Sequence, residues 1–128
     1  MKPVITFDFD WTLTKAKVCD EGFWWSSNTP NKPMLRHLNN MSKSFDVKIV
    51  TSRSSQKLPE VLQFVENHKL PVSDVIATNG EDKALTLKEL KSVIHFDDDE
   101  VEIKEIEKLH PDCSPILITP VTDERSTL

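Results

Sequence analysis

The sequence predicts an α/β fold in which a central parallel sheet is covered by helices on both faces. Two observations support this prediction: short apolar runs alternate with segments of helical periodicity, and each run is too apolar for one of its faces to meet water. The chain has 128 residues, enough for one compact domain and too few for two ordinary ones. We therefore expect a single domain over residues 1–122.

Five apolar, β-favouring runs are the expected strands. Each is short and is followed by polar residues or a proline, as buried strands of a parallel sheet are. They occupy residues 4–7, 46–50, 74–77, 93–96 and 116–118.

Four segments with apolar residues at steps of three and four are the expected helices. In one of them Leu58, Val61, Leu62 and Val65 form the apolar stripe, and Pro59 falls in the first turn, where proline is tolerated. The helices cover residues 33–41, 58–68, 84–90 and 101–109, and the last one stops before a proline.

Two stretches do not follow this alternation. Residues 14–32 contain Phe23, Trp24, Trp25 and Pro30 without a clear period, and we expect a flap at residues 13–29. Residues 123–128 form a polar tail that we expect to be frayed.

Charge and cysteine content narrow the class of protein. The formal net charge of -5 argues against a broad nucleic-acid-binding face, which needs many Lys and Arg contacts to phosphates. Cys19 and Cys113 stand far apart and outside any metal-binding cluster, so we expect free thiols and no zinc site. No apolar stretch is long enough for a signal peptide or a membrane span, so we expect a cytoplasmic protein without membrane contact.

Polar residues follow the expected strands where a ligand site is expected. In open parallel α/β sheets the ligand lies at the carboxyl ends of the strands. The side chains at these points are carboxylates, a hydroxyl and cations, namely Asp8, Asp10, Thr51, Arg53, Lys83, Asp97 and Asp98.

This set fits the hydrolysis of a phosphate monoester. The phosphoryl group is already negative, so a catalyst must supply a nucleophile, neutralise the oxygens and protonate the leaving group. Asp8 stands where a carboxylate nucleophile is needed, and Asp10 is placed to act as general acid and then to activate water. Thr51 and Lys83 offer donors for the phosphoryl oxygens. Asp97 and Asp98 offer the hard oxygen ligands that Mg²⁺ prefers.

Four segments, in order, resemble the motifs of the haloacid dehalogenase superfamily. The first is an apolar strand followed by Asp-x-Asp-x-Thr, here ITFDFDWTL at residues 5–13. The second is an apolar strand ending in Thr or Ser, here KIVT at residues 48–51. The third is a lysine ahead of the fourth strand, best matched by Lys83, and the fourth is a strand ending in paired acids, VIHFDD at residues 93–98. The resemblance spans residues 1 to about 118.

The resemblance implies a Rossmann-like three-layer α/β/α sandwich with phosphatase activity, since the aspartate at position 10 is the general acid that a dehalogenase lacks. It implies that Asp8 is the nucleophile and a Mg²⁺ ligand. It also implies that Asp10 is the general acid and base and binds the ion through its backbone carbonyl. It implies that Thr51 and Lys83 contact the phosphoryl group. It implies finally that Asp97 and Asp98 complete the metal site, directly or through water.

The spacing of the motifs leaves no room for a cap domain. Between the first and second motifs there is space for the flap and one helix, and between the second and third for a helix and a strand. The chain is thus identified as a capless member. An open site of this kind admits large substrates, unless the flap or a second copy of the chain closes it.

Several positions leave alternatives open. Trp11 stands where the family commonly has glycine and puts a large ring near the mouth of the site. Lys88 competes with Lys83 for the role of motif lysine. Ser52 and Arg53 are candidate substrate contacts, because Thr-Ser-Arg is similar to a segment of polynucleotide phosphatases in this superfamily. A surface ion pair is the alternative for Arg53.

Aromatic residues and His95 have both structural and functional interpretations. Trp24 and Trp25 either pack against the domain or a subunit, or stack on a base at the entrance. We expect His95 to be a core histidine without a catalytic role.

The function favoured by the sequence is a phosphatase for a nucleotide or a polynucleotide 3′-phosphate. One alternative is a phosphatase for a sugar or another small metabolite, with a homo-oligomer interface serving as the cap. The other is a phosphate-binding module without catalysis.

Overall fold

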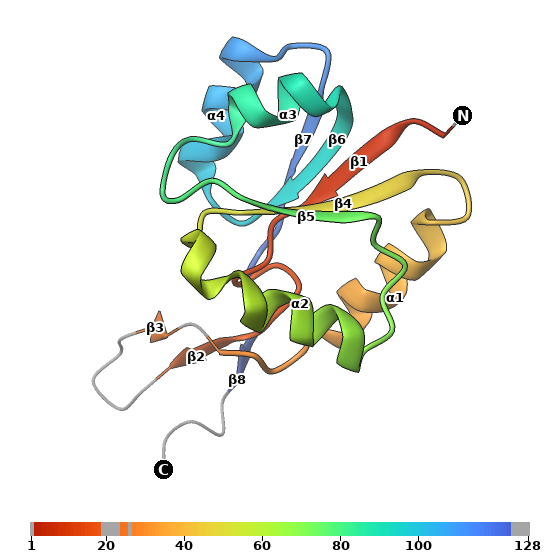
Figure 1. Cartoon of the computed structure of the whole chain (residues 1–128). Helices are drawn as coiled ribbons and strands as arrows, with labels where there is room; N and C mark the ends of the chain where they lie inside the picture. Colours follow the sequence, from red (N-terminus) through yellow and green to blue (C-terminus); the bar gives the residue numbers. More distant parts are fainter. Residues whose placement is uncertain (1, 19–23, 26, 124–128) are drawn as a thin grey trace.

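The computed structural model describes residues 2–18, 24–25 and 27–123 (Figure 1). Its central sheet has five strands, all parallel, in the order β5-β4-β1-β6-β7. The strands are β1 (Val4–Phe7), β4 (Asp46–Thr51), β5 (Asp74–Ala77), β6 (Ser92–Asp97) and β7 (Ser114–Leu117). The predicted α/β class with a parallel sheet is confirmed.

The four helices of the described residues cover the two faces of this sheet, one pair on each face (Figure 1). One pair is α1 (Lys32–Met41) and α2 (Leu58–Asn67), and the other is α3 (Ala84–Leu90) and α4 (Glu100–Leu109). A short 3₁₀ helix, η1 (Ser55–Lys57), leads into α2. The three-layer, Rossmann-like arrangement follows from the sequence pattern, because each helix has one apolar stripe that must be buried.

The core lies in two clusters, one on each face of the sheet. The first joins β1 and β4 to α1 and α2, with Ile5, Val47 and Leu38 inaccessible or nearly so. The second joins β4 to α3 and α4 through Val50, Leu87 and Ile106. Apolar residues face both layers, which is why the strands lack the alternation of a half-exposed sheet.

The order of the strands fixes the position of the ligand site. The chain runs from β1 outward through β4 to β5, then returns to the other side of β1 to form β6 and β7. In such sheets the crevice at the switch point, at the carboxyl ends of the strands, is where ligands bind. The switch lies between β1 and β6, which end at Phe7 and Asp97.

A second, smaller sheet stands beside the carboxyl ends of the main strands, where no regular structure was expected. It has the order β3-β2-β8, with β2 (Ala16–Val18), β3 (Trp24–Trp25) and β8 (Thr122–Asp123). β2 pairs antiparallel with β3 and parallel with β8. The flap segment is thus tied to the chain near residue 122, while the polar tail beyond residue 123 lies outside the described residues.

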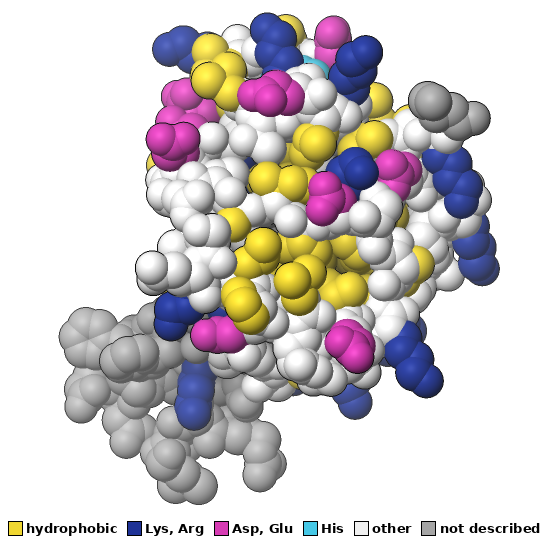
Figure 2. Space-filling model, in the orientation of Figure 1, with side chains coloured by type: hydrophobic (Ala, Val, Ile, Leu, Met, Phe, Trp, Pro, Cys, Tyr) yellow, Lys and Arg dark blue, Asp and Glu magenta, His cyan; other side chains and the backbone are white. Residues whose placement is uncertain are grey.

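The molecular surface carries charges of both signs. Figure 2 shows, on the face of α2 and β5, a central group of hydrophobic side chains with Lys, Arg, Asp and Glu around it. Among the described residues, none of the helices has the length and apolar character that a membrane crossing requires. These residues also form no second domain that would cap the sheet edge.

Candidate active site at the switch point of the sheet

Asp8 and Asp97 lie side by side because their strands are neighbours. Asp8 follows β1 directly, and its backbone N–H donates to the carbonyl of Phe96 at 2.8 Å, which extends the β1–β6 pairing one residue past the strand. Asp97 is the last residue of β6, and Asp98 follows it. The sheet register therefore places the two acidic segments next to each other.

Three carboxylates converge at this point. Asp8, Asp97 and Asp98 each offer an oxygen that lies within 4.8 Å of the oxygens of the other two. Asp8 and Asp97 are buried and Asp98 is half-buried, so solvent reaches the group from one side. Hard carboxylate oxygens in a cluster of this size suit a Mg²⁺ ion.

Lys83 provides the positive charge inside this group. Its Nζ lies 2.6 Å from Oδ1 of Asp8 and 2.8 Å from Oδ2 of Asp97, and the residue is only 2% exposed. Burial lowers the pKa of Lys83, but the two carboxylates outweigh this effect and raise it, so the side chain stays an ammonium. Three carboxylates and one ammonium leave an excess of two negative charges, which a divalent cation would balance.

Ionisation of all three carboxylates is unfavourable at this site. Burial raises the pKa of Asp8 well above its usual range, against the opposing effect of Lys83 and with a further increase from Asp97. Burial, together with the charge of Asp97, also raises the pKa of Asp98. A bound cation would relieve both effects, so the residues present fit the ion that the resemblance implies.

Both oxygens of Asp8 are held by donors. Lys83 bonds Oδ1, and the hydroxyl of Thr12 donates to Oδ2 at 3.1 Å. Thr12 is itself fixed in a turn, because the Asn31 side-chain amide donates to its carbonyl at 3.1 Å. The Asp8 carboxylate therefore has a defined orientation.

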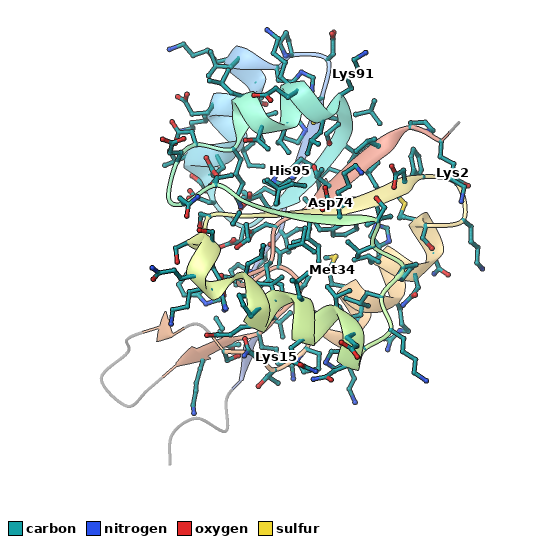
Figure 3. The ribbon with its side chains drawn as sticks, viewed as in Figure 1. Lys2, Lys15, Met34, Asp74, Lys91 and His95 are labelled. Carbon is teal, nitrogen blue, oxygen red and sulfur yellow. The ribbon has the colours of Figure 1, made fainter. Side chains whose placement is uncertain are left out.

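His95 is buried, as expected of a core histidine, and its ring contacts the Asp97 carboxylate, which the sequence prediction did not include. Its Nε2 lies 2.8 Å from Oδ2 of Asp97, and its Nδ1 lies 2.7 Å from the hydroxyl of Thr6, its register partner on β1. Burial, together with the charge of Lys83, lowers the pKa of His95, so the ring is neutral. A neutral ring that donates from Nε2 and accepts at Nδ1 satisfies both contacts. Figure 3 shows His95 in the interior of the molecule.

The contacts of Asp97 stabilise its ionised form. Burial alone would raise its pKa, but the hydrogen bond from His95 and the charge of Lys83 outweigh burial and lower the pKa to about 2. The backbone N–H of Asp99 also donates to Oδ1 at 3.1 Å. The sequence did contain a signal for His95, because residues 95 and 97 of one strand point to the same face.

Glu102 is a second residue that the sequence prediction missed. It lies in the first turn of α4, and its Oε2 is 4.0 Å from the Nζ of Lys83. The backbone N–H of Lys83 donates to its Oε1 at 3.4 Å. Glu102 thus helps to fix the start of α3, the position from which Lys83 reaches the acids.

Asp10 is engaged by a different partner. Arg53, which follows β4, donates from Nη2 to Oδ1 of Asp10 at 2.7 Å and from Nε to Oδ2 at 2.9 Å. Its Nη1 bonds Glu60 on α2 at 3.2 Å, and its guanidinium carbon lies 5.0 Å from the centre of the Phe9 ring. The hydrogen bonds that Arg53 donates to Asp10 raise the pKa of Arg53. Asp10 can serve as a general acid only after this two-pronged contact opens.

The other sequence candidates occupy different places. The Thr51 hydroxyl is buried at the end of β4 and accepts from the backbone N–H of Arg53 at 3.2 Å, whereas Ser52 is exposed in the wall of the pocket. Of the two candidate lysines, Lys83 reaches the acids and Lys88 is exposed on α3. The side chains of Trp24 and Trp25 lie outside the described part of the structure, so their contact with a base stays a prediction.

The acids open into a pocket of about 660 Å³. Its walls include Asp8, Asp10, Trp11, Ser52 and Lys83. A smaller pocket of about 370 Å³ adjoins it, with Asp10 in the walls of both. Arg53 and Lys57 line the smaller one, together with Glu60, Ser27 and Asn28.

No protein-family model, curated protein or solved structure compared with this chain matches it. The resemblance to the haloacid dehalogenase superfamily therefore stays a prediction from four sequence motifs. The fold and the geometry of the acids stand independently of it.

Proposed function

We propose that the chain is a capless phosphatase of the haloacid dehalogenase superfamily that hydrolyses phosphate monoesters in the cytoplasm, with Mg²⁺ as cofactor. The observation that carries this proposal is the convergence of the Asp8, Asp97 and Asp98 oxygens within 4.8 Å of one another, with the buried ammonium of Lys83 against Asp8 and Asp97. The open pocket in front of these groups has room for a phosphoryl group and part of its ester.

The side chains of Asp8, Asp97 and Asp98 would hold the cofactor, with the backbone carbonyl of Asp10 as a further ligand. When bound, Mg²⁺ neutralises charge on the phosphoryl oxygens and so permits attack by a carboxylate. Lys83 contributes a second positive charge that is already in place. Thr51 and Ser52 are the proposed further donors to the phosphoryl group.

In the first step an oxygen of Asp8 attacks phosphorus. The bond between phosphorus and the ester oxygen breaks, and Asp8 becomes an aspartyl-phosphate. Thr12 and Lys83, which bond the two oxygens of Asp8, orient the carboxylate for this attack. Once Arg53 has released it, Asp10 takes up a proton from water and then donates this proton to the leaving oxygen.

In the second step Asp10 accepts a proton from a water molecule that attacks the aspartyl-phosphate. The bond between phosphorus and Asp8 breaks, phosphate leaves, and both carboxyl groups return to their starting state. Arg53 is the natural partner for phosphate as well as for Asp10, since its planar fork fits either anion. We propose that it contacts substrate when it leaves Asp10.

The proposed substrate is a nucleotide or a polynucleotide 3′-phosphate. The absence of a cap among the described residues and the position of Arg53 support this choice. A sugar phosphatase in which a second copy acts as cap is the alternative, and gel filtration with a panel of phosphate esters separates the two. Activity only in the oligomer, with sugar phosphates preferred, would favour the alternative.

Phosphate release from this panel, measured with Mg²⁺ and with EDTA, tests the activity itself. The proposal expects release that needs Mg²⁺ and is lost in Asp8→Asn. Release that survives in Asp8→Asn would contradict Asp8 as the nucleophile, and no release from any ester would leave a binding module without catalysis.

A further inference from the structure

A row of buried polar side chains runs from the start of β6 to the acids of the site. The hydroxyl of Ser92 lies 2.8 Å from that of Thr6, which in turn lies 2.7 Å from Nδ1 of His95. Nε2 of the same ring lies 2.8 Å from Oδ2 of Asp97. Each of these four residues is at most 1% exposed, so solvent does not interrupt the row.

These polar groups lie in a layer that is otherwise apolar. Thr6 points to the face of the sheet opposite to that of Ile5 and Phe7, because side chains alternate along a strand. This is the face covered by α3 and α4, where the core contains Leu87 and Ile106. A buried hydroxyl or imidazole is unfavourable unless it is hydrogen-bonded, whereas an apolar side chain would fill the same space without this condition. Such local departures from an apolar core are expected at functional sites.

The direction of the hydrogen bonds follows from the chemistry of Asp97. An ionised carboxylate can only accept, so Nε2 of His95 carries a hydrogen and donates it. In the neutral ring Nδ1 is then an acceptor, and among the described side chains Thr6 supplies its donor. The Ser92 hydroxyl donates to the carbonyl of Ile94 at 2.9 Å. Thr6 therefore fixes the tautomer of the His95 ring and holds the ring in place.

The His95 ring in turn determines how the Asp97 carboxylate is occupied. Oδ2 of Asp97 lies 2.8 Å from Nε2 of His95 and 2.8 Å from Nζ of Lys83. Oδ1 accepts one bond, from the backbone N–H of Asp99 at 3.1 Å, and so has capacity for a further partner. Groups that hold a metal ligand in this way orient it, and their loss typically weakens metal binding by about 10- to 100-fold.

We propose that Thr6 is a positioning residue for the divalent cation, which holds the His95 ring against Asp97 and thereby sets the affinity of the site for Mg²⁺. This inference rests on the proposed function, in which Asp97 is a ligand of the ion. Thr6 contacts neither the acids nor the pocket, so its effect passes through His95. It is expected to appear in Mg²⁺ binding rather than in the chemical step.

Titration of the ester-free protein with Mg²⁺, followed by calorimetry, tests the proposal. Thr6→Val keeps the shape of the side chain but removes the hydroxyl, so the dissociation constant of Mg²⁺ is expected to rise about tenfold. Thr6→Ser retains the donor and should retain most of the affinity. Ser92→Ala is the matched control, since it removes a buried hydroxyl 2.8 Å from that of Thr6 but leaves the donor to Nδ1. Its affinity should stay close to that of the unmodified chain.

A double-substitution cycle shows whether Thr6 acts through His95. His95→Leu should weaken Mg²⁺ binding at least as much as Thr6→Val, and adding Thr6→Val to it should have no further effect. The thermal transition and circular dichroism establish that each variant is folded. Additive losses in the cycle, or an unchanged Mg²⁺ affinity in folded Thr6→Val, would overturn the proposal.

Nitrogen NMR of the unmodified chain in EDTA provides a test that needs no folded Thr6→Val. The His95 signals are assigned by their absence in His95→Leu. The proposal expects a hydrogen on Nε2 and an unprotonated, hydrogen-bonded Nδ1. The opposite tautomer, or a mixture of the two, would overturn it.

Phosphate release separates this proposal from the proposed function. In Thr6→Val, half-maximal release should need about ten times more Mg²⁺, while the rate at saturating Mg²⁺ should approach that of the unmodified chain. A loss confined to structure would instead lower the rate at every Mg²⁺ concentration. If no ester is hydrolysed, the phosphatase proposal fails, and calorimetry still decides the role of Thr6. Absence of Mg²⁺ binding to the unmodified chain would overturn that role.

Discussion

The Nζ of Lys83 and the Oδ1 of Asp8 lie 2.6 Å apart, and the side chains of both residues are at least 94% buried. This contact places a fixed positive charge beside the proposed nucleophile. It does not cancel the effect of burial, because the pKa of Asp8 is still raised well above its usual range. The ionised Asp8 is therefore a source of instability in the metal-free protein.

Replacing Asp8 by asparagine is expected to stabilise the metal-free protein. A folded-state pKa above the unfolded value means that ionisation at neutral pH favours unfolding, and the amide removes this effect. The free energy of unfolding in EDTA, from urea titration at neutral pH, should rise.

Asp97→Asn is the matched comparison and should act in the opposite direction. The pKa of Asp97 is lowered to about 2, so its ionised form stabilises the fold above its unfolded pKa, and this stabilisation is lost as the pH falls toward 2. We expect a loss of about 2 kcal/mol at neutral pH. Equal changes in the free energy of unfolding for Asp8→Asn and Asp97→Asn would contradict the opposite pKa shifts of these two buried acids.

Mg²⁺ is expected to raise the unfolding temperature by binding the folded state. At about a hundred times its dissociation constant, a ligand adds about 2.7 kcal/mol of stability. The shift should disappear in Asp98→Asn, which lacks one of the three converging carboxylates. Asp112→Asn, which changes an exposed acid in the turn after α4, should keep it. An equal shift in both variants would mean that Mg²⁺ binds elsewhere.

His95 is expected to make the stability of the fold sensitive to mild acid. Burial lowers the folded-state pKa of His95, so the unfolded chain takes up a proton first as the pH falls below about 6.5. The stability that the neutral ring provides is present above this pH and is lost below it, with a slope of at most about 1.4 kcal/mol per pH unit.

Urea titrations of His95→Gln between about pH 5 and 7.5 measure this slope, because glutamine does not titrate in this range. The variant should be less stable at neutral pH and lose less stability on acidification. His68→Gln, at an exposed position on the same protein, should follow the unmodified curve. A slope unchanged in His95→Gln would show that the pKa of His95 is the same in the folded and unfolded states, against the expected lowering.

Arg53→Lys is expected to lower kcat/KM by about tenfold, because a lysine cannot reproduce the two-pronged contact with Asp10 or with a phosphoryl group. The Mg²⁺-induced shift in unfolding temperature should remain, since Arg53 is not among the converging acids. Lys57→Ala alters another cation of the adjoining pocket, one paired at 3.8 Å with Glu60, and serves as control. Unchanged turnover in Arg53→Lys would mean that Arg53 has no role in the reaction and only forms a surface ion pair.

The layers of the fold could be predicted because they depend on local apolar pattern. Strand β1 and helix α3 begin and end as predicted, since an apolar run or stripe meets a clear polar stop at each end. Strand β7 begins at Ser114, two residues before the predicted start. Pro115 argued against a strand at this point, but β7 lies at the edge of the sheet, where proline is tolerated.

Contacts that link distant segments could not be predicted in this way. The pairing of Ala16 with Thr122 joins strands of two or three residues, too short to show a period. The contact of Thr6 with His95 depends on the register between β1 and β6, which is set by the packed sheet rather than by either segment. Sequence order indicated which strand ends carry acids, but not that Arg53 would engage Asp10.

The central claim is that Asp8 takes up phosphorus while the acids around it hold one divalent ion. Mass spectrometry of acid-quenched protein, mixed briefly with Mg²⁺ and benzyl phosphate and then digested, tests it most directly. We predict a peptide containing Asp8 that has gained one phosphoryl group, and no such peptide in Asp8→Asn or without Mg²⁺. Turnover without this adduct, or an adduct on a different residue, would contradict the account.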